Sequence, residues 1–143
     1  MRTLRDLFAQ SGVDAARYFF LMRNDDAQFV FDIDLAIRQT DDNPCPTCSY
    51  AHTRIAGIFR TAGVERDAPS ADGVDLECLA EVDEHALMKW LAEYPKVVAK
   101  AAATLEPHRM IGYLEGVARC VNGWYHRHRV LGDDEALMRT ACV

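Results

Sequence analysis

Apolar residues recur at helical spacing along most of the chain, and this pattern constrains the fold more than any other feature. The clearest case follows Asn43, a residue type favoured as a helix N-cap, with Pro44 and Pro46 in the first turn, where a missing N–H breaks no helical hydrogen bond. An advance of about 100° per residue predicts one apolar stripe on this helix, with Cys45 and His52 at its edge. The stripe consists of Cys48, Ala51, Ile55, Ile58 and Phe59.

Two shorter helices are predicted before this one. The first is an amphipathic segment that begins near residue 4 and ends at Ser11 and Gly12. Asp14 is a suitable N-cap for the second, in which apolar residues again recur at helical spacing. These residues are Ala15, Phe19 and Met22.

The segment at residues 28–34 is the only strand candidate. Phe29, Phe31 and Ile33 alternate there with other residues, which fits either a short strand or a non-helical, extended connection. Everything else indicates an all-α fold, a helical bundle with one short exception.

The second half of the chain follows a loop at residues 63–77 that is rich in Gly, Asp and Pro. A helix is predicted from residue 84 to Pro95, where it ends, and another occupies residues 96–106. Pro107 then begins the last helix at its first position, and this helix ends near residues 131–132. Its predicted buried face comprises Met110, Leu114, Val117, Val121 and Tyr125.

The size of the chain and its cysteine content fit a cytoplasmic protein with reduced thiols. The 143 residues are enough for one domain, and no apolar run approaches the roughly 20 residues of a membrane span. Five cysteines, an odd number spread along the chain, do not form the pattern of a secreted disulfide framework. We therefore expect no membrane partner and a cytoplasmic location.

The cysteines of the C-P-T-C sequence at residues 45–48 could belong to the core, to a metal site or to a redox site. Cys45, Cys48 and His52 could supply three zinc ligands, with Cys120 or His126 as the fourth, although the second C-x-x-C typical of such sites is absent. A thioredoxin-like redox site would place its C-x-x-C between a strand and a helix within a βαβ unit, and nothing else in the sequence indicates such a unit. Free cysteine is among the most buried residue types, so we favour core cysteines and expect no metal.

Charge is unevenly distributed along the chain. The net charge of −6 argues against nucleic acid as a partner, but ten acidic and four basic residues lie between residues 61 and 106, whereas five basic residues face four acidic ones from residue 107 to 143. A local basic patch is therefore compatible with the acidic total.

Two clusters combine aromatic and cationic residues in a way that suits RNA. Tyr50 and Arg54 stand at i and i+4 of the helix that follows Asn43, and the sequence WYHRHR occupies residues 124–129. The first cluster is compatible with an ordinary solvated face. The second is compatible with a structural role, in which Trp124 or Tyr125 anchors the core and Arg127 and Arg129 complement the dipole at the helix C-terminus. Each is also compatible with bases that stack on the aromatic rings while cations hold the phosphates.

Successive landmarks of the chain resemble arginyl-tRNA synthetase, in order and at matching spacing. They are TLRDL, GVDAARYFFLMR, FDIDLA, DNP followed by YAHTRI, LAEYPKVV, and LEPHRMIGYLEGVARCVNGWYHRHRVLGDDEAL. The resemblance implies a remnant of a class I catalytic core at residues 1–40 and the helical anticodon-binding domain, of the type named after its D-A-L-R pattern, at residues 41–143. The implied partner is arginine tRNA rather than DNA.

The same resemblance implies which residues meet the tRNA and which activities are missing. Tyr50, His52 and Arg54 match the family, while Arg109, Tyr125, Arg127, His128 and Arg129 are candidates through helix placement and basic character. Neither the H-I-G-H-like nor the K-M-S-K-like motif is present, so we expect no catalysis by this chain alone. ATP and Mg²⁺ would belong to the catalytic core.

The resemblance also implies that the chain lacks the last helix of the family's bundle, and the apolar groove left open would favour self-association. The alternative functions are an inert helical interaction module derived from a synthetase and, as a minor possibility, a metal-binding helical protein that uses Cys45, Cys48 and His52.

Overall fold

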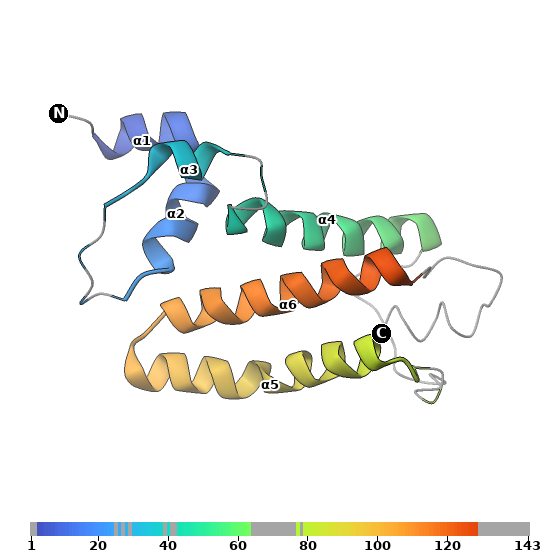
Figure 1. The fold of residues 1–143 in the computed structure, drawn as a ribbon. Coiled ribbons are helices and arrows are strands. Elements are labelled where there is room, and N and C mark those ends of the chain that lie inside the picture. Colours follow the sequence, from blue (N-terminus) through green and yellow to red (C-terminus); the bar gives the residue numbers. More distant parts are fainter. Residues whose placement is uncertain are drawn as a thin grey trace.

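The computed structural model describes residues 3–24, 26, 28, 30–38, 40, 43–63, 77 and 79–128, and these contain helices and no strand (Figure 1). Three short helices come first: α1 (Leu4–Ser11), α2 (Val13–Leu21) and α3 (Ile33–Ile37). Three longer ones follow: α4 (Pro44–Ala62), α5 (Val82–Thr104) and α6 (His108–Arg127). The prediction of an all-α bundle is confirmed.

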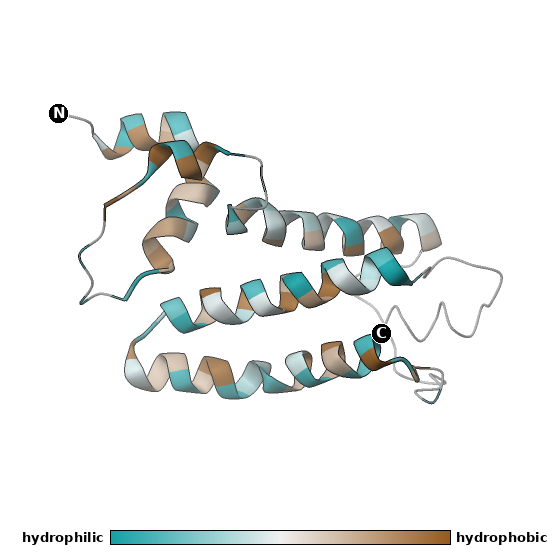
Figure 2. Cartoon of the chain, in the orientation of Figure 1, coloured by the Kyte–Doolittle hydropathy of each residue, from teal (hydrophilic) through white to brown (hydrophobic). Residues whose placement is uncertain are grey.

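Helix α6 lies between α4 and α5 and packs against both (Figure 1). It runs parallel to α4 and antiparallel to α5, while the three short helices gather near the start of α4. Apolar and hydrophilic residues alternate in bands along the long helices, as expected of amphipathic helices (Figure 2). Small clusters of buried side chains join α4 to α6 and join α2 to α3.

Local hydrogen bonds and one glycine fix the first two helices. Thr3 and Asp6 form a capping box at the start of α1, in which Thr3 Oγ1 accepts from Asp6 N and Thr3 N donates to Asp6 Oδ2. Gly12 follows Ser11 with φ of 80°, a conformation that favours glycine, so the predicted end of α1 is confirmed. Asp14 is not the N-cap of α2; Gly12 is, and Asp14 lies in the first turn, where its charge suits the helix dipole.

The segment at residues 28–34 is not a strand in its described part. Residues 28 and 30–32 are non-helical, and α3 begins at Ile33. The Asp32 side chain caps this helix by accepting from Leu35 N at 3.0 Å. The apolar Phe31 in this segment makes a tertiary contact instead of belonging to a strand. Its ring centroid lies 5.6 Å from that of Phe19.

Asn43 joins the end of α3 to the start of α4, and its side chain is wholly buried. Its Oδ1 accepts from Cys45 N at 3.1 Å, which confirms the predicted N-cap. Its Nδ2 donates to three backbone carbonyls, those of Leu35 (2.9 Å), Ala36 (3.1 Å) and Arg38 (2.8 Å). One amide therefore satisfies groups at two helix ends.

The apolar stripe predicted for α4 is confirmed. Ala51 and Ile58 are buried, while His52 is exposed beyond the edge of the stripe. The helix ends at Gly63, whose φ of 68° is the left-handed conformation common after a helix.

Helix α5 does not end at Pro95, contrary to the prediction from the sequence. It continues through this residue to Thr104. Proline removes one backbone hydrogen bond to the residue four positions earlier, Leu91, and both Leu91 and Pro95 are exposed, so water can bond the carbonyl that is left.

The buried face of α6 also differs from the predicted one. Leu114 and Tyr125 are 43% and 39% exposed. The buried face is rotated relative to the predicted one because α6 packs against both α4 and α5. Small residues on α6 allow these helices to approach it closely. The buried residues are Gly116, Ala118, Val121 and Trp124. Pro107 is the N-cap rather than the first helical residue, and the predicted end near residues 131–132 lies outside the described residues.

Gly116 of α6 packs directly against the indole of Trp90 on α5. A Cβ atom at this position would overlap the six-membered ring of Trp90. We expect Gly116→Val to lower the free energy of unfolding by about 2 kcal/mol, because overpacking forces the indole to move. Gly112→Val on the same helix is the matched control, since a Cβ there meets nothing within 4 Å. Urea denaturation of the two variants measures the difference, and equal stabilities would contradict the packing of Trp90 on Gly116.

Candidate nucleic-acid interface

A pair of polar side chains ties α4 to α6 at the centre of the candidate interface. Arg54 Nη1 donates to Asn122 Oδ1 at 2.6 Å, and Asn122 Nδ2 donates to the Thr47 carbonyl at 3.2 Å. The Arg54 guanidinium also lies over the ring of Tyr125, 5.0 Å from its centroid, in a cation–π contact. The guanidinium is therefore held in one place before any ligand arrives.

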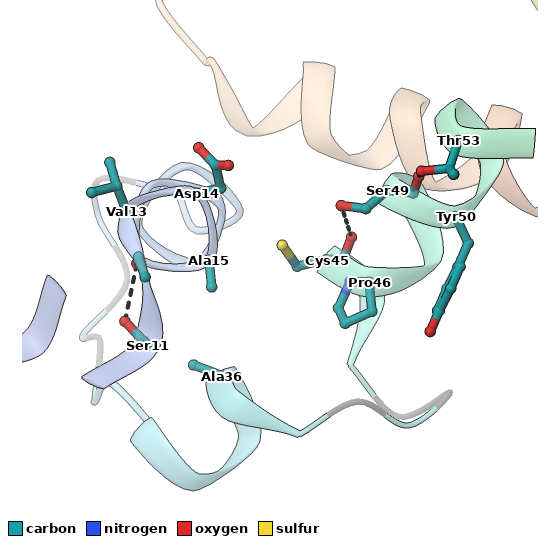
Figure 3. A pocket seen from close by; sticks show the side chains of 11 residues that line it. Ser11, Val13, Asp14, Ala15, Ala36, Cys45, Pro46, Ser49, Tyr50 and Thr53 are labelled. Atoms are coloured by element: carbon teal, nitrogen blue, oxygen red, sulfur yellow. Dashed lines mark hydrogen bonds between the residues drawn. The ribbon is translucent and has the colours of Figure 1, made fainter. Parts of the chain in front are cut away.

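Tyr50 lies one helical turn before Arg54, and its side chain is 55% exposed. It borders an open cavity of about 400 Å³ between the α1–α2 turn and the start of α4 (Figure 3). Asp14, Ser49 and Thr53 contribute polar groups to the same cavity, and Cys45 contributes its sulfur. A flat ring beside polar groups is suited to an unstacked base, which is recognised by stacking and by hydrogen bonds to its edges.

We call Tyr50, Arg54, Asn122 and Tyr125 the Tyr50 surface. It combines two half-exposed aromatic side chains with one positioned cation, drawn from two helices. The sequence predicted Tyr50 with Arg54 and, separately, Tyr125, and the structure brings Arg54 and Tyr125 into contact. It does not place His52 with them. His52 is two positions from both Tyr50 and Arg54, and a separation of two residues corresponds to about 200° around a helix.

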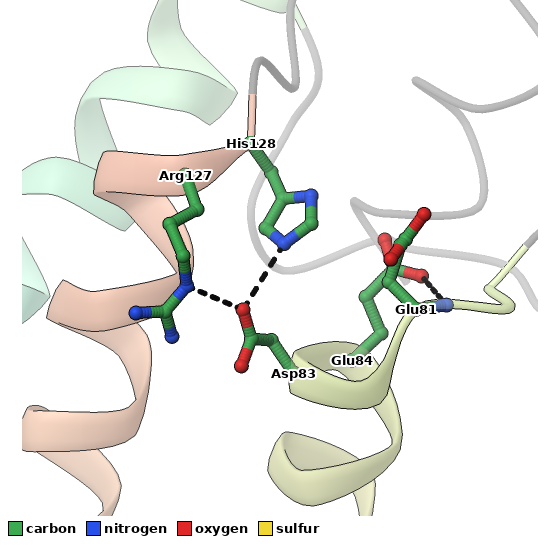
Figure 4. A network of polar contacts seen from close by, with 5 residues as sticks. All are labelled: Glu81, Asp83, Glu84, Arg127 and His128. Atoms are coloured by element: carbon green, nitrogen blue, oxygen red, sulfur yellow. Dashed lines mark hydrogen bonds and ion pairs between the residues drawn. The ribbon is translucent and has the colours of Figure 1, made fainter.

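The basic end of α6 is engaged in internal contacts (Figure 4). Arg127 Nε donates to Asp83 Oδ2 at 2.5 Å, and His128 Nε2 lies 3.3 Å from the same oxygen. The hydrogen bond from Arg127 lowers the pKa of the Asp83 carboxyl, and the pairing raises the pKa of Arg127. Trp124 is buried and His128 stacks on it with ring centroids 6.2 Å apart. These contacts offset the positive charge that the sequence suggested was available for RNA.

Two further predicted residues lie apart from the Tyr50 surface or beyond the description. Arg109, at the other end of α6, pairs with Glu106 at 2.5 Å. Arg129 lies outside the described residues. The role of each in RNA binding stays a prediction.

The C-P-T-C cysteines are partly buried side chains that pack against the core. Cys45 and Cys48 lie against the cluster formed by Tyr18, Phe19 and Ala36. Burial raises the pKa of the Cys48 thiol to about 11, with a further contribution from Glu115, and burial also raises the pKa of Cys45. Both thiols are protonated at neutral pH, whereas the thiolate is the form that binds metals and attacks disulfides.

No metal-binding arrangement occurs in the described part of the chain, where no three His, Cys, Asp or Glu residues are grouped to hold an ion. His52 is exposed, whereas the two cysteines are half-buried against α2.

The described helices also include none with the length and hydropathy needed to cross a bilayer.

Asn122, Thr47 and Asp83 hold predicted candidate residues in place and were not predicted from the sequence. Asn122 had a detectable signal, since it is a polar residue one turn before Tyr125 and next to the apolar Val121. The Thr47 carbonyl and the Asp83 carboxylate gave no such signal, because their roles depend on how α4 and α5 pack against α6.

Comparisons with known proteins assign the fold to a family. Residues 48–141 match the model of the DALR anticodon binding domain. The chain belongs to this family. It is 47% identical over 136 residues to an arginine–tRNA ligase of Geotalea daltonii and 45% identical over 135 residues to one of Bordetella avium. Each alignment covers 94% of this chain and 24% of the relative, so the chain spans about a quarter of the length of these relatives.

The chain also has a structural neighbour. An arginyl-tRNA synthetase from Campylobacter jejuni superposes with a TM-score of 0.79 over 96% of this chain and 30% of the other, at 24% identity. This likeness supports the helical arrangement, in which α4 and α6 carry the Tyr50 surface.

Proposed function

We propose that this DALR domain binds the anticodon loop of arginine tRNA through the Tyr50 surface. The proposal rests on the family and on relatives that are arginine–tRNA ligases. The single observation that carries it is the contact of Arg54 with both Asn122 and Tyr125, one turn from the exposed ring of Tyr50.

The chemistry of this surface suits single-stranded RNA. A splayed base stacks on the exposed Tyr50 ring, and such stacking contributes about 1–3 kcal/mol per base. Arg54 presents nitrogen donors that are already oriented by Asn122, so less side-chain entropy is lost when a phosphate or a base edge accepts from them.

Removing the Tyr50 ring tests the proposal. We expect Tyr50→Ala to weaken binding of an arginine-tRNA anticodon stem-loop by about tenfold or more, because the stacking contribution is lost. Tyr50→Phe is the matched control and should retain most of the affinity, since it keeps the ring. Fluorescence anisotropy of labelled RNA measures both variants.

Specificity requires a second RNA with a changed anticodon. The proposal predicts weaker binding to this RNA than to the arginine stem-loop. Equal affinities, or no measurable binding to either RNA, would contradict anticodon recognition and favour a helical interaction module without RNA.

A further inference from the structure

A second cavity, of about 460 Å³, lies between α5 and α6, away from the Tyr50 surface. Trp90 and Tyr113 form its aromatic wall, and Gly112 leaves room because it has no side chain. Its rim includes the cationic side chains of Lys100 and Arg109. The volume falls in the range of roughly 300–1,000 Å³ that is common for small-ligand sites.

The aromatic wall is rigid although it is partly exposed to solvent. The Tyr113 hydroxyl donates to the Trp90 carbonyl at 2.9 Å, which fixes the orientation of the tyrosine ring. The Trp90 and Tyr113 ring centroids lie 5.8 Å apart, and Tyr94 packs on Tyr113 at the same distance. Trp90 is 38% exposed, so part of its indole is free to contact a ligand.

The charge around the groove favours an anion. Lys96, Lys100 and Arg109 line it together with one acidic residue, Glu93, which pairs with Lys96 at 2.6 Å. Arg109 pairs with Glu106 at 2.5 Å. Lys100 forms no ion pair with any residue that the structure describes, so its ammonium is available to a phosphate.

We propose that this α5–α6 groove is a nucleotide-binding subsite, in which a base contacts the Trp90–Tyr113 wall and its phosphate meets Lys100. Aromatic rings beside a cation form the combination that binds nucleotides irrespective of base identity. The nucleotide is either free or part of an RNA chain, since both present the same base and phosphate.

The groove and the Tyr50 surface are separate sites. They share no residue, and Gly112 and Asn122 lie ten positions apart on α6, which is about 15 Å along the helix. Binding in the groove therefore does not depend on the proposed function, and each proposal has its own variant.

Gly112→Leu fills the groove without disturbing the packing. A Cβ at residue 112 meets nothing within 4 Å, and leucine is a better helix former than glycine. We expect AMP to quench the tryptophan emission of the full chain saturably through Trp90, because Trp124 is buried. Gly112→Leu should abolish this saturable quenching.

Charge variants on α5 provide a matched comparison. Lys100→Glu should weaken AMP binding by about tenfold, because a phosphate contact is replaced by repulsion. Lys89→Glu makes the same change on the same helix outside the groove and should leave AMP binding unchanged.

A second titration with the anticodon stem-loop distinguishes the two sources of the nucleotide. If AMP quenches the emission and Gly112→Leu abolishes this quenching, the groove is a site for free nucleotides. If the stem-loop quenches but AMP does not, and Gly112→Leu abolishes the quenching, the groove is a site for nucleotides within RNA. The proposal is overturned if neither probe quenches, or if the quenching survives in Gly112→Leu. The groove is tested by Gly112→Leu with AMP and the Tyr50 surface by Tyr50→Ala with the stem-loop, so failure of one proposal remains distinguishable from failure of the other.

Discussion

Replacing Trp124 with alanine is expected to lower the free energy of unfolding by about 4 kcal/mol, the largest effect of any single substitution considered. The Trp124 side chain is 5% exposed and contacts Ile58, with Ile55 and Phe59 packed around them. Alanine would leave a cavity between α4 and α6 that these neighbours cannot fill. Urea denaturation followed by circular dichroism measures the loss.

Trp124→Phe separates packing from hydrogen bonding. The buried indole Nε1 has no hydrogen-bond partner among the described residues, so phenylalanine keeps most of the apolar contact and removes no such bond. We expect a loss of about 1–2 kcal/mol for this variant. A loss as large as that of Trp124→Ala would show that the indole nitrogen contributes a contact of its own.

The second large effect is expected at Asn43. Asn43→Ala removes the donor shared by three carbonyls and the acceptor of Cys45 N, all at a side chain with no solvent exposure. We expect a loss of about 3 kcal/mol, since buried polar groups without partners are costly. The same denaturation experiment measures it.

Asn43→Asp tests which half of the amide matters. The carboxylate still accepts from Cys45 N. Its second oxygen, however, would replace the Nδ2 donor and face the carbonyls of Leu35, Ala36 and Arg38, which are all acceptors. We therefore expect this nearly isosteric change to destabilise at least as much as Asn43→Ala at neutral pH. Near-native stability of Asn43→Asp would mean that the N-cap alone is important.

Local chemistry explains why most helices could be predicted from the sequence. Asn43, Pro44 and Pro46 define the start of α4 by their own backbone preferences, and Gly12 defines the end of α1. The second role of Asn43, at the end of α3, could not be predicted, because it depends on a tertiary contact between the Asn43 side chain and the carbonyls of Leu35, Ala36 and Arg38.

Tertiary context overrode two local signals. Pro95 is a strong helix breaker in isolation, yet it lies on an exposed side of α5, where water can bond the carbonyl that proline leaves without a helical partner. On α6, the apolar spacing through Leu114 and Tyr125 indicated one buried face, whereas contact with two helices buries Gly116 and Ala118.

The candidate site could be predicted only in part for the same reason. The spacing of Tyr50 and Arg54 follows from helix geometry, so their proximity could be predicted. The position of Tyr125 under Arg54 and the pairing of Arg127 with Asp83 join residues that are distant in sequence. No local pattern encodes those contacts.

The central position of α6 has a consequence for the order of folding. Helices α5 and α6 are joined through residues 105–107, whereas α4 is separated from α5 by residues 63–81. Closing a short loop loses less chain entropy than closing a long one, so the α5–α6 hairpin is the pairing expected to form first. Helix α4 would then dock on a preformed surface that includes Ala118 and Val121, and the Tyr50 surface would be completed late in folding.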